Sequence, residues 1–181
     1  MVWVRSEYAG ELAVLSAWLA ALVPWNVTYS PNVAGGSLLF VRFPFLQVRY
    51  AFGVPLARAV DVSDPLSAAA FQAGSSIQVA YQAWIVGAAV LAVAVGLSLL
   101  YYRREAAVEA GPVDPVRLMG ALLTLGAVTL AAATYLLATR GFPGIPIPVG
   151  VVVTLVLGAV LLRVERTGAT ARGDSSDGPT A

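Results

Sequence analysis

Long uncharged apolar stretches alternate with short polar stretches along this chain. Residues 77–102, 118–139 and 142–162 contain no charged side chain, and residues 9–27 contain only Glu11 near their beginning. About 20 apolar residues in a helix cross the hydrocarbon core of a bilayer, so each stretch is long enough for one span. The pattern predicts an all-α membrane protein, a four-helix transmembrane bundle with spans near 9–27, 77–102, 117–139 and 145–162.

The first span has a second interpretation, because its central run, residues 12–23, has the length of the apolar core of a signal peptide. Signal peptides begin with a positively charged segment, whereas this head carries one basic side chain and two acidic ones. We therefore expect a retained helix rather than a cleaved leader.

The segment 28–76, between the first two spans, has a different character. Turn residues come first, followed by a run dense in aromatic and β-branched residues that Pro44 interrupts. Strands at 38–43 and 46–52 would flank Pro44, which would break a helix. An open hairpin leaves backbone groups unpaired in lipid, so we expect an extracytoplasmic, apolar, β-hairpin-like segment at the mouth of the bundle. It would either seat the loop on the bundle or provide a docking surface.

The charged residues of this segment are the candidate binding residues. Arg42 and Arg49 are each embedded in apolar sequence, and a guanidinium group binds carboxylate or phosphate in a bidentate manner. They would pair with Asp61, Asp64 or lipid phosphate, or would only keep the hairpin hydrated. Asp64 precedes Pro65, which also predicts an N-cap and a short helix to about residue 73. The candidate contacts with a partner or a lipid headgroup are Arg42, Arg49, Asp61 and Asp64.

Arginines at the ends of the spans predict the orientation. The four-span arrangement places most of the eleven arginines on the side of both termini, so both termini are expected to be cytoplasmic. Residues 1–166 would form the integral membrane domain. Residues 167–181 are rich in Gly, Ser, Thr and Asp and predict a disordered cytoplasmic tail.

Small residues within the spans predict close helix packing, because they let helix backbones approach each other. They recur at spacing four in two spans: Ala88, Ala92 and Gly96, then Gly150, Thr154 and Gly158. The polar residues of the last three spans are Ser, Thr and Gln, which bond to helix backbones.

Composition narrows the chemistry. Hydrophobic residues make up 59% of the chain and charged residues 12%, against roughly 25% charged residues in soluble domains. Cysteine and histidine are absent, which removes thiol nucleophiles and the commonest metal ligand. The net charge of +1 does not suggest a nucleic-acid partner. No catalytic, cofactor-binding or metal-binding residue is indicated, so we do not expect an enzyme.

The leading functional hypothesis is a non-catalytic accessory or assembly subunit that binds other membrane components. The alternative is a small transporter or channel for a neutral or apolar solute, since the last three spans carry no charge to couple to an ion. The partners expected on either hypothesis are the lipid bilayer and, for the first, another membrane protein.

Three blocks of sequence resemble a known group of proteins. They are the opening MVWVRSEYAGEL, Pro24-Trp25 after the first span, and FVRFPFLQVRY at 40–50. Together they resemble an uncharacterised family of multi-pass membrane proteins from haloarchaea, most closely over about the first 55 residues. The resemblance implies a membrane location and an archaeal lineage, and it supplies neither an activity nor a site residue.

Overall fold

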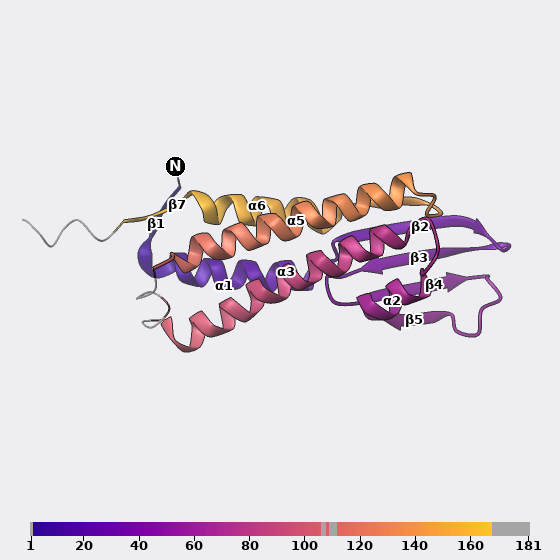
Figure 1. The fold of residues 1–181 in the computed structure, drawn as a ribbon, viewed down its shortest axis with the longest axis horizontal. Coiled ribbons are helices and arrows are strands. Elements are labelled where there is room, and N and C mark those ends of the chain that lie inside the picture. Colours follow the sequence, from indigo (N-terminus) through magenta and orange to yellow (C-terminus); the bar gives the residue numbers. More distant parts are fainter. Residues whose placement is uncertain (1, 106–107, 109–111, 168–181) are drawn as a thin grey trace, which may run out of the picture.

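The computed structural model of the chain describes residues 2–105, 108 and 112–167. Four long helices lie side by side, and a β-sheet extends beyond one end of this bundle (Figure 1). The long helices are α1 (Ser6–Leu22), α3 (Gln78–Arg103), α5 (Pro115–Thr139) and α6 (Val149–Arg163). The expected disordered tail lies, from residue 168 onward, outside the described residues.

The sheet has the strand order β5-β4-β3-β2-β6, and every neighbouring pair is antiparallel. Its strands are β2 (Asn26–Val33), β3 (Gly36–Arg42), β4 (Gln47–Phe52), β5 (Val60–Ser63) and β6 (Ile145–Ile147). The turn between β2 and β3 includes Ala34 and Gly35, both with positive φ. The sheet is therefore built mainly from one segment, and β6 joins it from far along the chain.

The prediction of an all-α fold is wrong. The described residues form an α/β fold in which five helices accompany the five-stranded sheet. The hairpin expected around Pro44 corresponds to β3 and β4, which pair with Arg42 opposite Gln47. The sequence pattern does not predict two further strands, because it places β2 partly in the first span and partly in a turn, and β6 in the fourth span. Their pairing, with Val27 opposite Ile147, joins residues distant in sequence, which local patterns do not reveal.

The short helix α2 (Pro65–Phe71) confirms the prediction made from Asp64-Pro65. One Asp64 carboxylate oxygen accepts hydrogen bonds from the backbone N–H groups of Leu66, at 2.9 Å, and Ser67, at 3.0 Å. A side-chain acceptor at this position satisfies N–H groups that have no partner within the helix. Figure 1 shows α2 alongside β4 and β5.

Strand pairs join the chain at both ends of α1 and α6. At the sheet end, β2 follows α1 and pairs with β6, which precedes α6. At the other end, β1 (Val2–Arg5) precedes α1 and pairs in parallel with β7 (Val164–Thr167), which follows α6. The two helices contain 17 and 15 residues, so each is only about 22–26 Å long. Pairing satisfies backbone groups in the strands just beyond these short helices.

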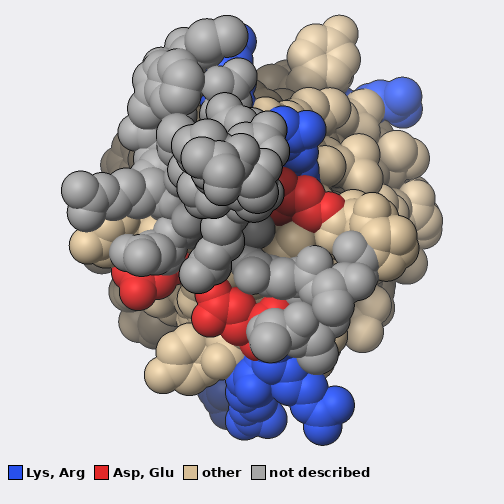
Figure 2. Space-filling model, turned by 90° about the vertical axis from the view of Figure 1, so that its left-hand side faces the viewer, with Lys and Arg blue, Asp and Glu red and all other residues tan. Residues whose placement is uncertain are grey.

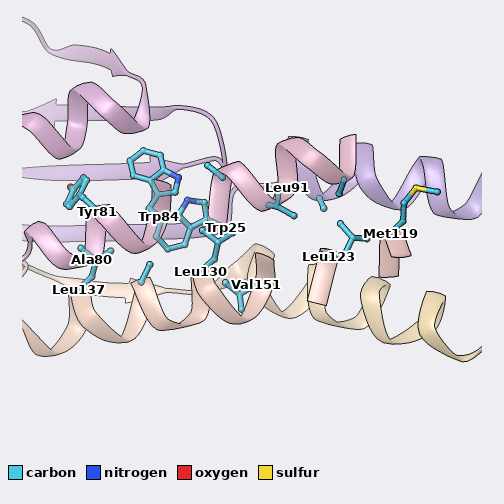
Figure 3. Packing of buried hydrophobic residues seen from close by; sticks show 14 of the residues in the cluster. Trp25, Ala80, Tyr81, Trp84, Leu91, Met119, Leu123, Leu130, Leu137 and Val151 are labelled. Carbon is cyan, nitrogen blue, oxygen red and sulfur yellow. The ribbon is translucent and has the colours of Figure 1, made fainter. Parts of the chain in front are cut away.

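The bundle core consists of large apolar side chains set against glycines of neighbouring helices. A Cβ atom on Gly87 would lie 2.8 Å from Leu130 of α5, and one on Gly126 would lie 2.8 Å from Leu91 of α3. Figure 3 shows Trp25 beside Trp84 at the sheet end of this core. Close packing is therefore present between α3 and α5, at glycines outside the small-residue repeats from which it was predicted.

Two described helices, α3 and α5, are long and apolar enough to cross a membrane by length and composition. The apolar helices at Tyr8–Leu22 and Val149–Arg163 are shorter. Each of the four helices overlaps one of the ranges expected for spans and extends slightly beyond it at one end. The largest differences are that α1 ends at Leu22 instead of reaching residue 27, and that α6 begins at Val149 instead of residue 145.

Candidate functional site

Two rows of mainly polar side chains cross one face of the sheet. Side chains of one strand point alternately to the two faces, so residues paired across neighbouring strands line the same face. The first row, from β2 to β5, is Asn26, Arg42, Gln47 and Ser63, and the second is Thr28, Phe40, Arg49 and Asp61. This face lies toward α2 and the first turns of α3, because Tyr81 and Ser67 line a cavity with residues of both rows. Its residues become more exposed from β2 toward β5.

Arg42 lies at the buried end of these rows and is 0% exposed. Its Nε donates a hydrogen bond to Gln47 Oε1 at 2.9 Å. Its Nη1 donates to Asn26 Oδ1 and to Thr28 Oγ1, both at 2.9 Å, and its Nη2 donates to Tyr81 OH at 3.3 Å. A single side chain therefore joins β2, β4 and α3 to β3.

Aromatic rings surround the Arg42 guanidinium where a carboxylate would be expected. The ring centroids of Phe142 and Phe40 lie 4.6 Å and 4.9 Å from its Cζ, close enough for a cation–π interaction. The ion pairs among the described residues, Arg49–Asp61 and Arg117–Asp114, do not include Arg42. Burial lowers the pKa of Arg42, and the nearby Tyr81 acts in the opposite direction. Because arginine keeps its proton in proteins, Arg42 holds a buried positive charge among neutral groups.

A cavity of about 460 Å³ lies over the more exposed part of the same face. The strands β3, β4 and β5 form its floor, and α2 and the start of α3 contribute its other walls. Its volume falls within the range typical of small-molecule sites. The residues that line it are Leu38, Phe40, Gln47, Arg49, Asp61, Ser63, Ser67, Ala68, Phe71, Gln72 and Tyr81. Gln47 and Tyr81 both bond to Arg42, so the cavity lies against the buried charge.

Arg49 is the charged donor that faces this cavity. Its Nη2 lies 3.7 Å from Asp61 Oδ2, which is an ion pair but too long for a hydrogen bond. Its Nε is buried and has no hydrogen-bond partner among the described residues. The Arg49 side chain is 26% exposed and the Asp61 side chain 37%. The pair therefore lies at the boundary between the cavity and solvent, with donor capacity left on the guanidinium.

Asp64 has a different role in the structure. Its second carboxylate oxygen accepts a hydrogen bond from Ser67 Oγ at 2.6 Å, and this bond is the largest cause of its lowered pKa. The carboxylate therefore stabilises the start of α2 fully above its ordinary pKa. That contribution is lost as the pH falls through the lowered folded-state pKa.

The structure brings together three of the four residues selected from the sequence. Arg42, Arg49 and Asp61 share one face of the sheet, while Asp64 caps α2 beside it. Sequence reasoning missed the neutral partners of Arg42: Asn26, Thr28, Gln47 and Tyr81. A signal existed in β2, where the polar residues at 26, 28 and 30 alternate with Val27 and Tyr29. That period of two is typical of a strand with a polar buried face.

A larger cavity, of about 620 Å³, lies between α1 and α3 at the opposite end of the bundle. Glu11 and Glu105 line it, and Tyr101 OH donates a hydrogen bond to Glu105 at 3.0 Å. Both carboxylates belong to exposed residues at helix ends, so this cavity lacks the buried charge of the sheet site. Within the described residues, no group of three potential metal ligands was found.

Fold and site together define an α/β protein in which a helix bundle carries a sheet with a polar, partly enclosed cavity. A family match covers residues 2–166, and the chain belongs to this family, the family of unknown function DUF7549. A search of curated proteins found no match to the chain.

Proposed function

We propose that this chain is an integral membrane protein in which α1, α3, α5 and α6 cross the bilayer and the sheet lies at one membrane surface. The outward-facing apolar side chains of the bundle carry this proposal. Only 33% of the apolar window of α3 and 39% of that of α5 are buried within the protein. A core helix of a soluble protein would bury most of such a window, whereas lipid is a suitable environment for exposed Val93, Leu125 and Val156.

The distribution of charge supports the same arrangement. Residues 65–102, 118–139 and 141–162 carry no charged side chain. Arg103, Arg117 and Arg163 lie at the helix ends far from the sheet, and Figure 2 shows arginine and acidic side chains on that end. Because arginine is enriched on the cytoplasmic side of membrane proteins, we assign this end to the cytoplasm and the sheet to the outside.

Within this arrangement we assign the chain a non-catalytic role, in which the sheet and α2 bind another membrane component. The site supports binding because it combines a buried charge, an arginine with donor capacity and a cavity at the membrane surface. The alternative, passage of a neutral or apolar solute, receives less support from the bundle interior. The side chains of Leu91, Leu123, Leu130 and Leu137 there are between 0% and 2% exposed.

Cysteine labelling tests the membrane arrangement, because the chain contains no cysteine of its own. Leu56→Cys places a thiol in the loop before β5, and Val113→Cys places one in the loop before α5. We expect a membrane-impermeant maleimide to label these two variants from opposite sides of sealed vesicles. Labelling of both from one side would contradict the proposed orientation.

A third variant, Leu125→Cys, is the matched control. Leu125 is 54% exposed in the structure and Val113 is 56% exposed, so water would reach both equally in a soluble protein. In a bilayer the thiol at 125 would face lipid, and we expect it to react only after detergent is added. Equal labelling at 113 and 125 in intact vesicles that expose the side of position 113 would overturn the membrane proposal.

A further inference from the structure

The cavity between the sheet and α2 combines a charged end with apolar walls. Arg49 and Asp61 lie on one side, and Leu38, Phe40 and Phe71 provide apolar surface. Phe71 is 81% exposed, so its ring is available to cover a bound chain. A ligand that fits both parts of the cavity must itself have a charged end and an apolar end.

The sign of the charge at the cavity favours an anion. Arg49 lines the cavity, and Arg42 lies directly behind Gln47 and Tyr81. Asp61 is the acidic residue in the lining and pairs with Arg49, so the charge of the buried Arg42 is left in excess beside the cavity. Asp64 lies outside the lining and is fully exposed, so solvent screens its charge.

Arg49 also retains the geometry needed to bind an oxyanion. The 3.7 Å separation from Asp61 leaves its donors without a short bond, and its Nε is buried with no partner among the described residues. A guanidinium group presents donors in a planar fork that matches two oxygens of a phosphate or carboxylate. The hydroxyl group of Ser63 lines the same cavity and is a further hydrogen-bond donor, whereas that of Ser67 already donates to Asp64.

We propose that this cavity binds an oxyanion that carries an apolar chain, such as the phosphate group of an anionic lipid, with Arg49 as the anchoring residue. The inference rests on the proposed function, since it places the cavity at the membrane surface beside the first turns of α3. Asp61 pairs with Arg49 and competes with the ligand for it. The apolar chain of the ligand lies against Leu38, Phe40 and Phe71.

Calorimetric titration of the full chain in an uncharged detergent tests this proposal. The probes are dihexanoyl phosphatidic acid, dihexanoylglycerol, which lacks the phosphate, and inorganic phosphate, which lacks the chains. We expect phosphatidic acid to bind more tightly than either other probe. Arg49→Gln should weaken its binding by about tenfold or more, because charge-assisted hydrogen bonds are lost. Arg58→Gln removes the same charge from an exposed loop residue outside the cavity and should leave binding unchanged.

Asp61→Asn should tighten binding several-fold, because it removes the competing negative charge, and a misfolded variant would not produce such a gain. Equal affinity of the unmodified chain and Arg49→Gln for phosphatidic acid would overturn the proposal. The proposal would also be overturned if inorganic phosphate or dihexanoylglycerol bound as tightly as phosphatidic acid. The titration needs no bilayer, so it is independent of the labelling experiment. If phosphatidic acid did not bind but positions 56 and 113 were labelled from opposite sides, this inference would be overturned and the proposed membrane arrangement would stand.

Discussion

Replacing Arg42 with alanine is expected to lower the free energy of unfolding by about 2–5 kcal/mol, because it leaves a cavity and removes the donor of several buried hydrogen bonds. The side chain is 0% exposed and donates to Gln47, Asn26 and Thr28 at 2.9 Å. Without it, Gln47 Oε1 stays buried and loses its donor, while Asn26 Oδ1 keeps only the hydrogen bond from Thr28 Oγ1 at 2.8 Å. An unpaired buried acceptor carries a desolvation cost. The detergent-solubilised variant should therefore unfold at a clearly lower temperature than the unmodified chain. Tryptophan fluorescence can measure this unfolding, since Trp84 lies close to Tyr81, a partner of Arg42.

Two further variants distinguish the effect of losing the hydrogen-bond network from the effect of losing a positive charge. Arg58→Ala removes a positive charge from an exposed position and should leave the unfolding temperature almost unchanged. Arg42→Lys keeps a positive charge but cannot reproduce the planar fork that reaches Gln47, Asn26 and Thr28 together, so it should fall between the two. If Arg42→Ala unfolded at the same temperature as Arg58→Ala, the buried network would not stabilise the fold.

Features that depend on neighbouring residues could be predicted from the sequence. Asp64-Pro65 and Asp114-Pro115 each place a side-chain cap before a proline at the first helical position, and both begin helices in the structure. The uncharged apolar stretches likewise form most of each long helix. Pro44 breaks the aromatic run and separates β3 from β4, as expected. In each case the physical cause acts within a few residues of the feature.

Features that depend on pairing across the chain were missed. β6 has only three residues, including Pro146, and it is a strand because β2 lies beside it. The β2 residues Asn26 and Thr28 would be poor core residues alone, and they are buried because Arg42 supplies donors to both. Arg42 was selected as a candidate contact for a partner or lipid, whereas the structure places it inside the protein. Its environment depends on β2, β4 and α3 together, which no local pattern specifies.

The second large effect is expected at the contact between α5 and α6, where Gly158→Leu should destabilise the protein by about 3 kcal/mol, at the upper end of overpacking costs. A Cβ atom at position 158 would lie 2.9 Å from the backbone nitrogen of Thr124 and 3.0 Å from the carbonyl oxygen of Gly120. Backbone atoms inside a helix cannot move individually, so the two helices would have to separate. Thermal unfolding in detergent, followed by tryptophan fluorescence, measures this effect.

Gly96→Leu provides the matched control, since it makes the same substitution in α3. No atom lies within 4 Å of a Cβ placed on Gly96, and the residue is exposed. Its replacement should leave stability unchanged or raise it by up to about 1 kcal/mol, because glycine is a poor helix former. Both glycines belong to small-residue repeats of spacing four in the sequence. Gly158 lies against the backbone of a neighbouring helix, whereas a Cβ atom at position 96 would not contact any other described element. Equal destabilisation by the two variants would show that helix separation is not the cause.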